Sequence, residues 1–109
     1  MVKLKNLKGV ANNIAASFDS HLPSMSYTKE VAFEVDLLTG KVIPPEVLTE
    51  SLAKDIEDVR SLLFGSCERL GLKEEDVQKA TLEIKGGAEG RYDITAKITV
   101  DGKEYIGFY

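Results

Sequence analysis

The chain has few of the residues that form covalent cross-links or bind transition metals. Its 109 residues include one cysteine, Cys67, and one histidine, His21. A single cysteine excludes a disulfide within the chain and a zinc site made of several cysteines. It also fits a reducing compartment, so we expect a cytoplasmic protein.

Long apolar runs are lacking as well. No stretch of the sequence is long and apolar enough to span a bilayer. Asn12 and Asn13 interrupt residues 10–18, so this segment does not form the core of a signal peptide. The lysines near the N-terminus have no tryptophan beside them, which weakens the case for a basic helix on a membrane surface. We therefore expect no membrane contact.

The chain has no excess of positive charge. The 14 lysines and arginines are outnumbered by 18 aspartates and glutamates, which gives a net charge of −4. A general nucleic-acid-binding domain normally shows a basic surface, so we expect no nucleic-acid partner. The content of 43% hydrophobic and 29% charged residues is ordinary for a soluble globular chain. The length fits one domain over residues 1–109.

The clearest structural pattern lies at residues 91–109. Apolar residues occupy every second position from residue 92 to residue 100, as in a strand with one buried face. Asp101 and Gly102 follow, and both tolerate the positive φ that a two-residue type I′ turn requires. The resulting hairpin places Tyr105 and Tyr109 on the buried side.

The same hairpin register predicts an unusual outer face. Ile106 and Phe108 fall on the side that should contact water, which leaves two interpretations. The outer face is partly apolar or covered by a loop, or it is a contact surface for a second subunit or a partner. The predicted outer pairs are Thr99 with Glu104, Lys97 with Ile106, and Thr95 with Phe108.

Two further strands and two helices are indicated. Alternating apolar residues predict strands at residues 31–37 and 77–85, and residues 42–43 either form a short return strand or run on to the next helix. Apolar spacings of three and four predict helices over residues 4–22 and 46–70. The second helix carries an apolar stripe that starts at Leu48, and Gly71 follows it as a C-cap.

Together these elements predict an α+β fold. It is a two-layer sandwich with a mainly antiparallel sheet of about four strands in α-β-α-β-β-β order, and both amphipathic helices cover one face. The strand at residues 31–37 joins an edge of the sheet. Between the next two strands, cross-strand charge favours pairing Lys85 with Asp93, or Glu83 with Arg91.

A glycine-rich loop at residues 86–90 is the first candidate for binding chemistry. Phosphate-binding loops run from a strand into a helix, where helix N-terminal amides meet the anion. This loop runs into a strand, which is more typical of a turn. As an alternative, Gly86, Gly87, Gly90 and Arg91 would form an anion-binding site.

No other pattern indicates catalysis, a metal or a cofactor. His21 is suited to an interaction with the C-terminal end of the first helix, and Cys67 falls on an apolar stripe, where a cysteine behaves as a small hydrophobe. The sequence leaves open whether either has a chemical role. Glu34 and Asp36 share a face with lysines, which favours a salt-bridged surface over a cation site.

The sequence therefore contains no motif that specifies an activity. We expect a small non-catalytic protein-interaction domain that forms a homodimer or binds a protein partner. The alternative is a small-molecule or anion-binding protein or enzyme with its site at residues 86–91, and a third is a module that captures a peptide at an edge strand. The expected interaction surface consists of Thr95, Lys97, Glu104, Ile106 and Phe108.

Overall fold

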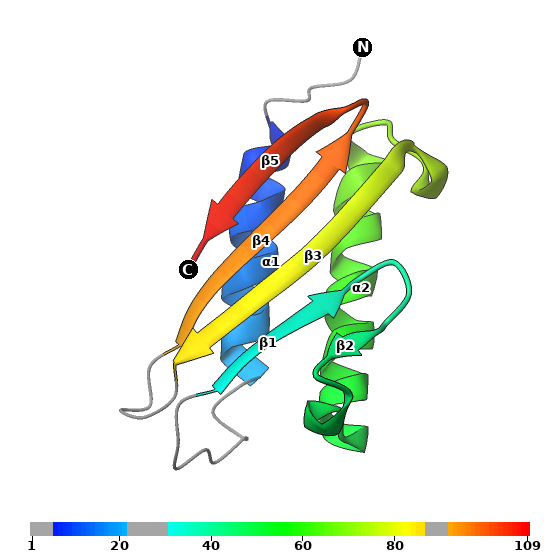
Figure 1. Cartoon of the computed structure of the whole chain (residues 1–109). Coiled ribbons are helices and arrows are strands. Elements are labelled where there is room, and N and C mark those ends of the chain that lie inside the picture. The colour runs from blue at the N-terminus through cyan, green and yellow to red at the C-terminus, as the bar shows by residue number, and fades with distance from the viewer. Residues whose placement is uncertain (1–5, 22–30, 87–91) are drawn as a thin grey trace.

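The computed structural model describes residues 6–21, 31–86 and 92–109 (Figure 1). Its helices are α1 (Leu7–His21) and α2 (Glu50–Arg69), with short 3-10 helices η3 (Pro45–Val47) and η4 (Glu74–Asp76). Its strands are β1 (Val31–Asp36), β2 (Val42–Ile43), β3 (Val77–Gly86), β4 (Tyr92–Val100) and β5 (Lys103–Phe108).

The strands form one sheet in the order β2-β1-β3-β4-β5, and all neighbouring strands are antiparallel. Both long helices lie on one face of this sheet, which we call the inner face (Figure 1). The predicted two-layer α+β sandwich is confirmed. The sheet has five strands rather than about four, because Val42 and Ile43 pair with Val35 and Glu34 of β1.

The core lies between the helices and the inner face. The predicted stripe of α1 is confirmed for Leu7, Ala11, Ile14 and Phe18, which are fully buried. Leu4 and Leu22, also expected on this helix, lie outside the described residues. The buried residues of α2 are Leu52, Ile56, Val59, Leu63 and Cys67.

The hairpin register is confirmed over its whole length. Asp101 and Gly102 have φ values of 54° and 74°, as a type I′ turn requires, and Tyr105 lies opposite Ile98. Ile94 and Tyr109 exchange two backbone hydrogen bonds. The expected burial of Tyr109 is wrong, because its side chain is 61% exposed at the end of the edge strand.

The register between β3 and β4 follows one of the two predicted alternatives. Lys85 lies opposite Asp93, which places unlike charges together. Arg91, named in the other alternative, lies outside the described residues. β1 joins the sheet along the free side of β3; the sequence predicts that this strand is added at an edge but leaves open which edge.

The helix α2 begins later than predicted. Thr49 is its N-cap, and the Thr49 side chain accepts a hydrogen bond from the backbone N–H of Leu52 at 3.0 Å. Leu48 therefore precedes the helix and is 44% exposed, so its predicted place on the apolar stripe is wrong. The predicted C-cap is confirmed: Gly71 has a φ of 82° and Leu72 N–H bonds to the carbonyl of Cys67.

The helix α1 lies directly against β5 at Gly107. A Cβ built on Gly107 would lie 2.7 Å from the Cβ of Ala11 and would overlap the backbone of Ala11 and Asn12. The close approach brings Asn12 to the edge of the sheet, where its Oδ1 accepts a 2.9 Å hydrogen bond from the backbone N–H of Phe108. This contact ties the edge strand to α1.

Candidate interaction surface

The outer face of the sheet is the side opposite the two long helices (Figure 1). Directly paired residues of antiparallel strands share a face, so the register arranges the outer face in four rows that run across the strands. In order from the β4–β5 turn, the rows are Lys79–Thr99–Glu104, Asp36–Thr81–Lys97–Ile106, Ile43–Glu34–Glu83–Thr95–Phe108 and Ala32–Lys85–Asp93.

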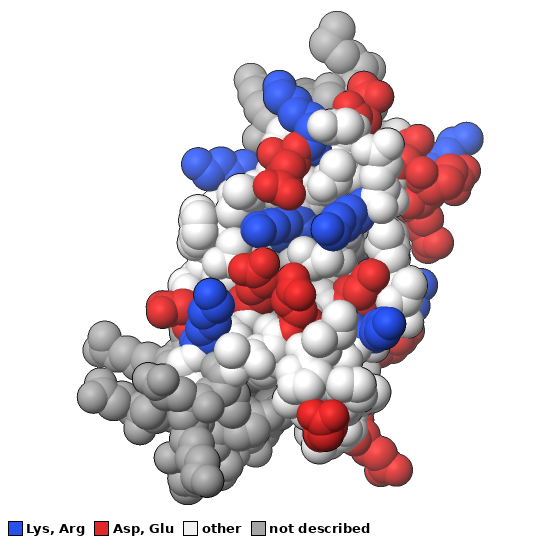
Figure 2. All heavy atoms as spheres, in the orientation of Figure 1, with Lys and Arg blue, Asp and Glu red and all other residues white. Residues whose placement is uncertain are grey.

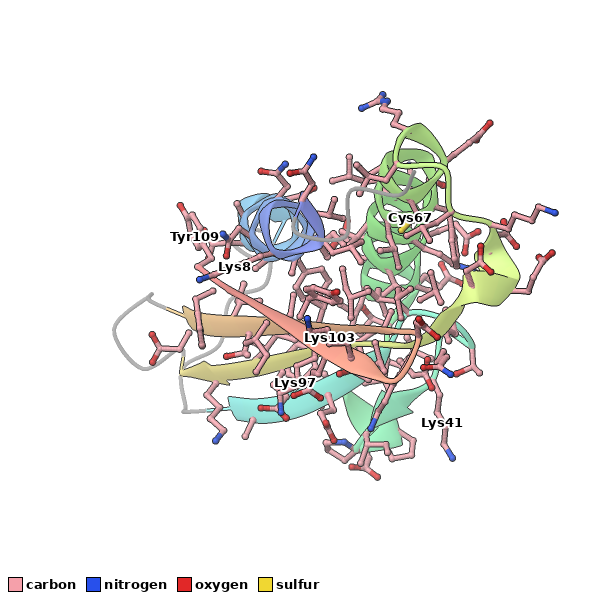
Figure 3. The ribbon with its side chains drawn as sticks, turned by 90° about the horizontal axis from the view of Figure 1, so that it is seen from above. Lys8, Lys41, Cys67, Lys97, Lys103 and Tyr109 are labelled. Atoms are coloured by element: carbon pink, nitrogen blue, oxygen red, sulfur yellow. The ribbon has the colours of Figure 1, made fainter. Side chains whose placement is uncertain are left out.

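Charges of each sign gather in bands on this face. Figure 2 shows lysines in a band across the middle of the face, with acidic side chains in the next band. Within the acidic band, Glu34 lies directly opposite Glu83, and like charges in this position lower stability. Lys97 extends on the side of the sheet away from the helices (Figure 3), and its Nζ lies 3.4 Å from Glu83 Oε1.

That ion pair compensates the acidic band in part. The side chains of Lys97 and Glu83 are each about one-third exposed, at 33% and 34%. Ion pairs in such solvent-exposed positions typically contribute about 0–1 kcal/mol. The band therefore keeps an excess of negative charge that attracts a positive group.

Two exposed apolar residues stand at opposite ends of the third row. Ile43 on β2 is 54% exposed and Phe108 on β5 is 66% exposed. Single exposed apolar residues are normal on protein surfaces. These two share one face and one row, with Glu34, Glu83 and Thr95 between them.

A shallow groove of about 390 Å³ lies at the β2 end of the outer face. Ala32 has a short side chain, which leaves a hollow, and β2 stops at Ile43, after which Pro44 has no N–H to continue the ladder. The volume of this groove is near the lower limit of about 300 Å³ for small-molecule pockets. The groove is lined by Ala32, Phe33, Glu34, Ile43, Pro44, Glu83, Ile84 and Lys85.

A larger hollow of about 780 Å³ lies beside the C-terminal half of α2. Charged side chains of both signs line it, including Glu57, Glu68 and Lys73. Arg60 also lines it. Its guanidinium makes a cation–π contact with Phe64, with the Arg60 Cζ 5.7 Å from the centre of that ring. The mixed charge gives this hollow no preference for one class of ligand.

The residues that the sequence predicts as an interaction surface do lie together. Thr95, Lys97, Glu104, Ile106 and Phe108 all stand on the outer face of β4 and β5, as the confirmed register requires. Glu104 and Phe108 are exposed, and the other three are half-buried. Whether they bind another molecule stays a prediction.

The sequence reasoning missed the opposite end of the face. Ile43, Pro44 and Ala32 were not predicted as part of the surface. The available signal is the apolar pair at residues 42–43, whose sequence allows either a return strand or a connection to the next helix. Choosing the strand would have placed Ile43 beside Glu34 and extended the surface to β2.

The alternative anion site falls mostly outside the described residues. Gly86 ends β3 with a φ of 118°. Gly87, Gly90 and Arg91 lie outside the described ranges. An anion-binding role for residues 86–91 therefore stays a prediction.

The described residues show no arrangement typical of catalysis. Among them, no group of three or more histidine, cysteine, aspartate or glutamate side chains is placed to hold a metal ion. Cys67 is 1% exposed on α2 (Figure 3), and burial raises the pKa of its thiol, which disfavours the reactive thiolate. His21 ends α1, and its side chain is outside the described part of the structure.

Both edges of the sheet carry features that limit the addition of another strand. At one edge β2 has only two residues and Pro44 follows it. At the other edge Asn12 occupies the backbone N–H of Phe108. Short edge strands, proline and covered edge groups are the usual means of preventing edge-to-edge pairing, so the structure gives little support to peptide capture by β-addition.

Comparison with protein-family models, curated proteins and solved structures finds no match. Among the described residues, no helix is long and apolar enough to cross a membrane.

Proposed function

We propose that this protein is a non-catalytic interaction domain that forms a homodimer through the outer face of its sheet. The observation that carries the proposal is the third row, in which exposed Ile43 and Phe108 stand at opposite edges of a face that no described helix covers. Burying such apolar area contributes about 25 cal/mol per Å² removed from water.

The balance of charge on the outer face supports a second copy as the partner. A two-fold symmetric interface brings the same patch of both subunits together, so the patch must be complementary to itself. A face with charges of one sign would repel its own copy. Here five carboxylates stand beside four lysines, so each copy offers partners of both signs. The carboxylates are Glu34, Asp36, Glu83, Asp93 and Glu104, and the lysines are Lys41, Lys79, Lys85 and Lys97.

The size of the face indicates a weak dimer. Strands about 4.8 Å apart and same-face residues about 6.6 Å apart give an area of roughly 24 Å by 26 Å, or about 600 Å² for each copy. The total of about 1,200 Å² is at the lower end for specific interfaces. Because many contacts at this face are polar, we expect a dissociation constant of about micromolar order.

The proposal is tested by measuring mass in solution with light scattering across a dilution series. The wild-type protein should pass from dimer to monomer over about 1–500 μM, a range around the expected dissociation constant. A constant monomer mass up to the highest concentration contradicts the proposal.

A replacement that introduces a charge at the exposed aromatic residue locates the interface. Phe108→Lys removes apolar area and should raise the dissociation constant by about tenfold or more, equivalent to about 1.4 kcal/mol. Leu48→Lys is the matched control, because Leu48 is also an exposed apolar residue but belongs to the connection between η3 and α2 and to no strand of the sheet. Both variants should fold, as judged by circular dichroism. Equal association of the two variants would place the interface elsewhere.

A further inference from the structure

We infer that Phe108 of each copy docks into the groove beside Ile43 and Pro44 of the other copy, around a two-fold axis parallel to β3. This inference rests on the proposed homodimer and specifies how its two faces meet. It assigns the groove an occupant, the aromatic side chain of a second copy of this chain.

The order of the strands places the two apolar ends symmetrically. β3 is the central strand of the sheet, with β2 and β5 each two strands away, or about 9.6 Å on either side. A two-fold axis that lies in the interface and runs along β3 exchanges these two edges. Because Phe108 and Ile43 occupy the same row, the rotation brings Phe108 of one copy over Ile43 of the other.

The two ends of the row also match in shape. Phe108 projects from the sheet with 66% of its surface exposed. At the other end, the groove of about 390 Å³ opens between Ile43, Pro44 and the short side chain of Ala32. An aromatic side chain buries about 150–250 Å² on docking, and two-fold symmetry makes the contact twice.

Charge favours this axis over the axis at right angles to it. Asp36 and Lys97 share the second row, each one strand from β3 on opposite sides, so rotation about β3 brings Lys97 of one copy over Asp36 of the other. An axis across the strands, between the second and third rows, would instead bring Asp36 over Glu34. It would also bring Lys79 over Lys85. Both of those are contacts between like charges, which are unfavourable.

The central strand is the remaining place where like charges approach. Lys79, Glu83 and Lys85 are on the outer face of β3, so each faces its own copy near the axis. Each Glu83 already has Lys97 at 3.4 Å, and packed sheets stand about 10 Å apart. That distance separates the backbones, so the side chains that project between them approach more closely and their repulsion opposes association. The two Lys97–Asp36 contacts offset part of this repulsion.

Cysteine cross-linking between two different variants tests this register. Ile43→Cys and Phe108→Cys are prepared separately, mixed in equal amounts at a concentration where wild type is dimeric, and treated with a short bis-maleimide cross-linker. Each mixed dimer keeps one native Phe108–Ile43 contact and places one new cysteine opposite the other. The native Cys67 is 1% exposed and so does not compete.

The mixture should give about fivefold more cross-linked dimer than either variant alone, because only in the mixture do two cysteines face each other across sheets about 10 Å apart, a distance that a short bis-maleimide linker spans. Phe108→Cys alone should cross-link poorly, since the two copies of residue 108 would lie four strands apart, about 19 Å. Glu104→Cys mixed with Ile43→Cys is the matched control, because residue 104 lies four residues from Phe108 on β5, about 13 Å away. It should give only background cross-linking.

The outcomes separate the inference from the proposal beneath it. If light scattering shows a dimer but the mixture cross-links no better than Phe108→Cys alone, the homodimer stands and this register is wrong. Preferential cross-linking of the Glu104→Cys mixture likewise overturns the register. A monomer at every concentration overturns the proposed function and the inference together.

Discussion

Replacing Gly107 with alanine tests whether the close contact between α1 and β5 is required for stability. The added Cβ would lie 2.7 Å from the Cβ of Ala11 and would overlap the backbone of Ala11 and Asn12. These backbone atoms belong to the middle of α1, so they cannot rotate away as a flexible side chain would. The helix as a whole must move outward.

The magnitude follows from that movement. Restoring a carbon–carbon separation of about 3.5 Å requires a shift of about 0.8 Å or more, and gaps of this size remove about a quarter to a half of the dispersion attraction at a contact. Overpacking of this kind lowers stability by about 1–3 kcal/mol. Loss of the Asn12–Phe108 hydrogen bond adds about 1 kcal/mol. We expect a total loss of about 2–4 kcal/mol, a large part of the about 5–15 kcal/mol that holds a typical domain together.

Urea unfolding followed by circular dichroism measures this loss. With a slope of about 2 kcal/mol per molar urea, the midpoint should fall by about 1–2 M. Gly65→Ala is the matched control, since no atom lies within 4 Å of a Cβ built on Gly65 in α2. That control should gain about 0.5–1 kcal/mol from helix propensity. A Gly107→Ala protein within about 0.5 kcal/mol of wild type, the scatter usual for surface substitutions, would refute the steric argument.

Three further predictions concern single side chains. Thr49→Ala removes the acceptor for the Leu52 N–H at 3.0 Å and should lower the free energy of unfolding by about 1 kcal/mol; an unchanged urea midpoint would show that the cap contributes little. Burial raises the pKa of the Asp19 carboxyl from its usual value of 3.8, so the folded state favours the protonated form over the charged form. The protonated form therefore stabilises the fold in acid, and this stabilisation is lost as pH rises through the folded-state pKa. Asp19→Asn should therefore stabilise the protein at pH 7 and lose this advantage below about pH 4, and an advantage that is larger in acid would contradict the sign. Burial raises the pKa of the Cys67 thiol, so it should react with a thiol reagent only on unfolding; rapid labelling of the native protein would show an accessible route to it.

Local rules were sufficient where one pattern and one turn determined the arrangement. The Asp101–Gly102 turn set the hairpin register, and the alternation on both sides then assigned each residue to a face. Charge across the strands reduced the register of β3 and β4 to two alternatives, and the structure shows one of them, Lys85 opposite Asp93. These features depend on neighbours in the sequence or on direct cross-strand contacts, which the residue types specify.

Features that depend on tertiary contacts were not predictable in the same way. In the sequence, nothing distinguishes Gly107 from any other glycine in a strand. Only the position of α1 shows that the missing side chain leaves room for the helix backbone. Leu48 fits the spacing of the helix stripe, but the cap at Thr49 excludes it from the helix. Tyr109 has the correct parity for burial, yet it is exposed at the end of an edge strand, where little of the core reaches it.

The candidate surface was predictable in part for the same reason. Its β4 and β5 residues follow from the hairpin register, whereas its β2 end depends on the two-residue strand at Val42 and Ile43. Such a short segment has too few positions to show a periodic pattern. The groove was not predictable, because it arises where β2 stops beside Ala32.

The third row of the outer face departs from two patterns of the rest of the fold, the burial of large apolar side chains and the pairing of unlike charges across strands. Ile43 and Phe108 are large apolar side chains left in water, and Glu34 lies opposite Glu83, a pairing that lowers the stability of the isolated domain. Sequences tend to break local rules where function requires it. A bound second copy would remove the first kind of departure, because it covers the apolar ends, and it would bring Lys97 of the other copy over Asp36, one row away from the acidic pair. β2 is short, and Asn12 covers part of the β5 edge. The outer face is therefore more accessible than either edge strand for the binding of a second copy.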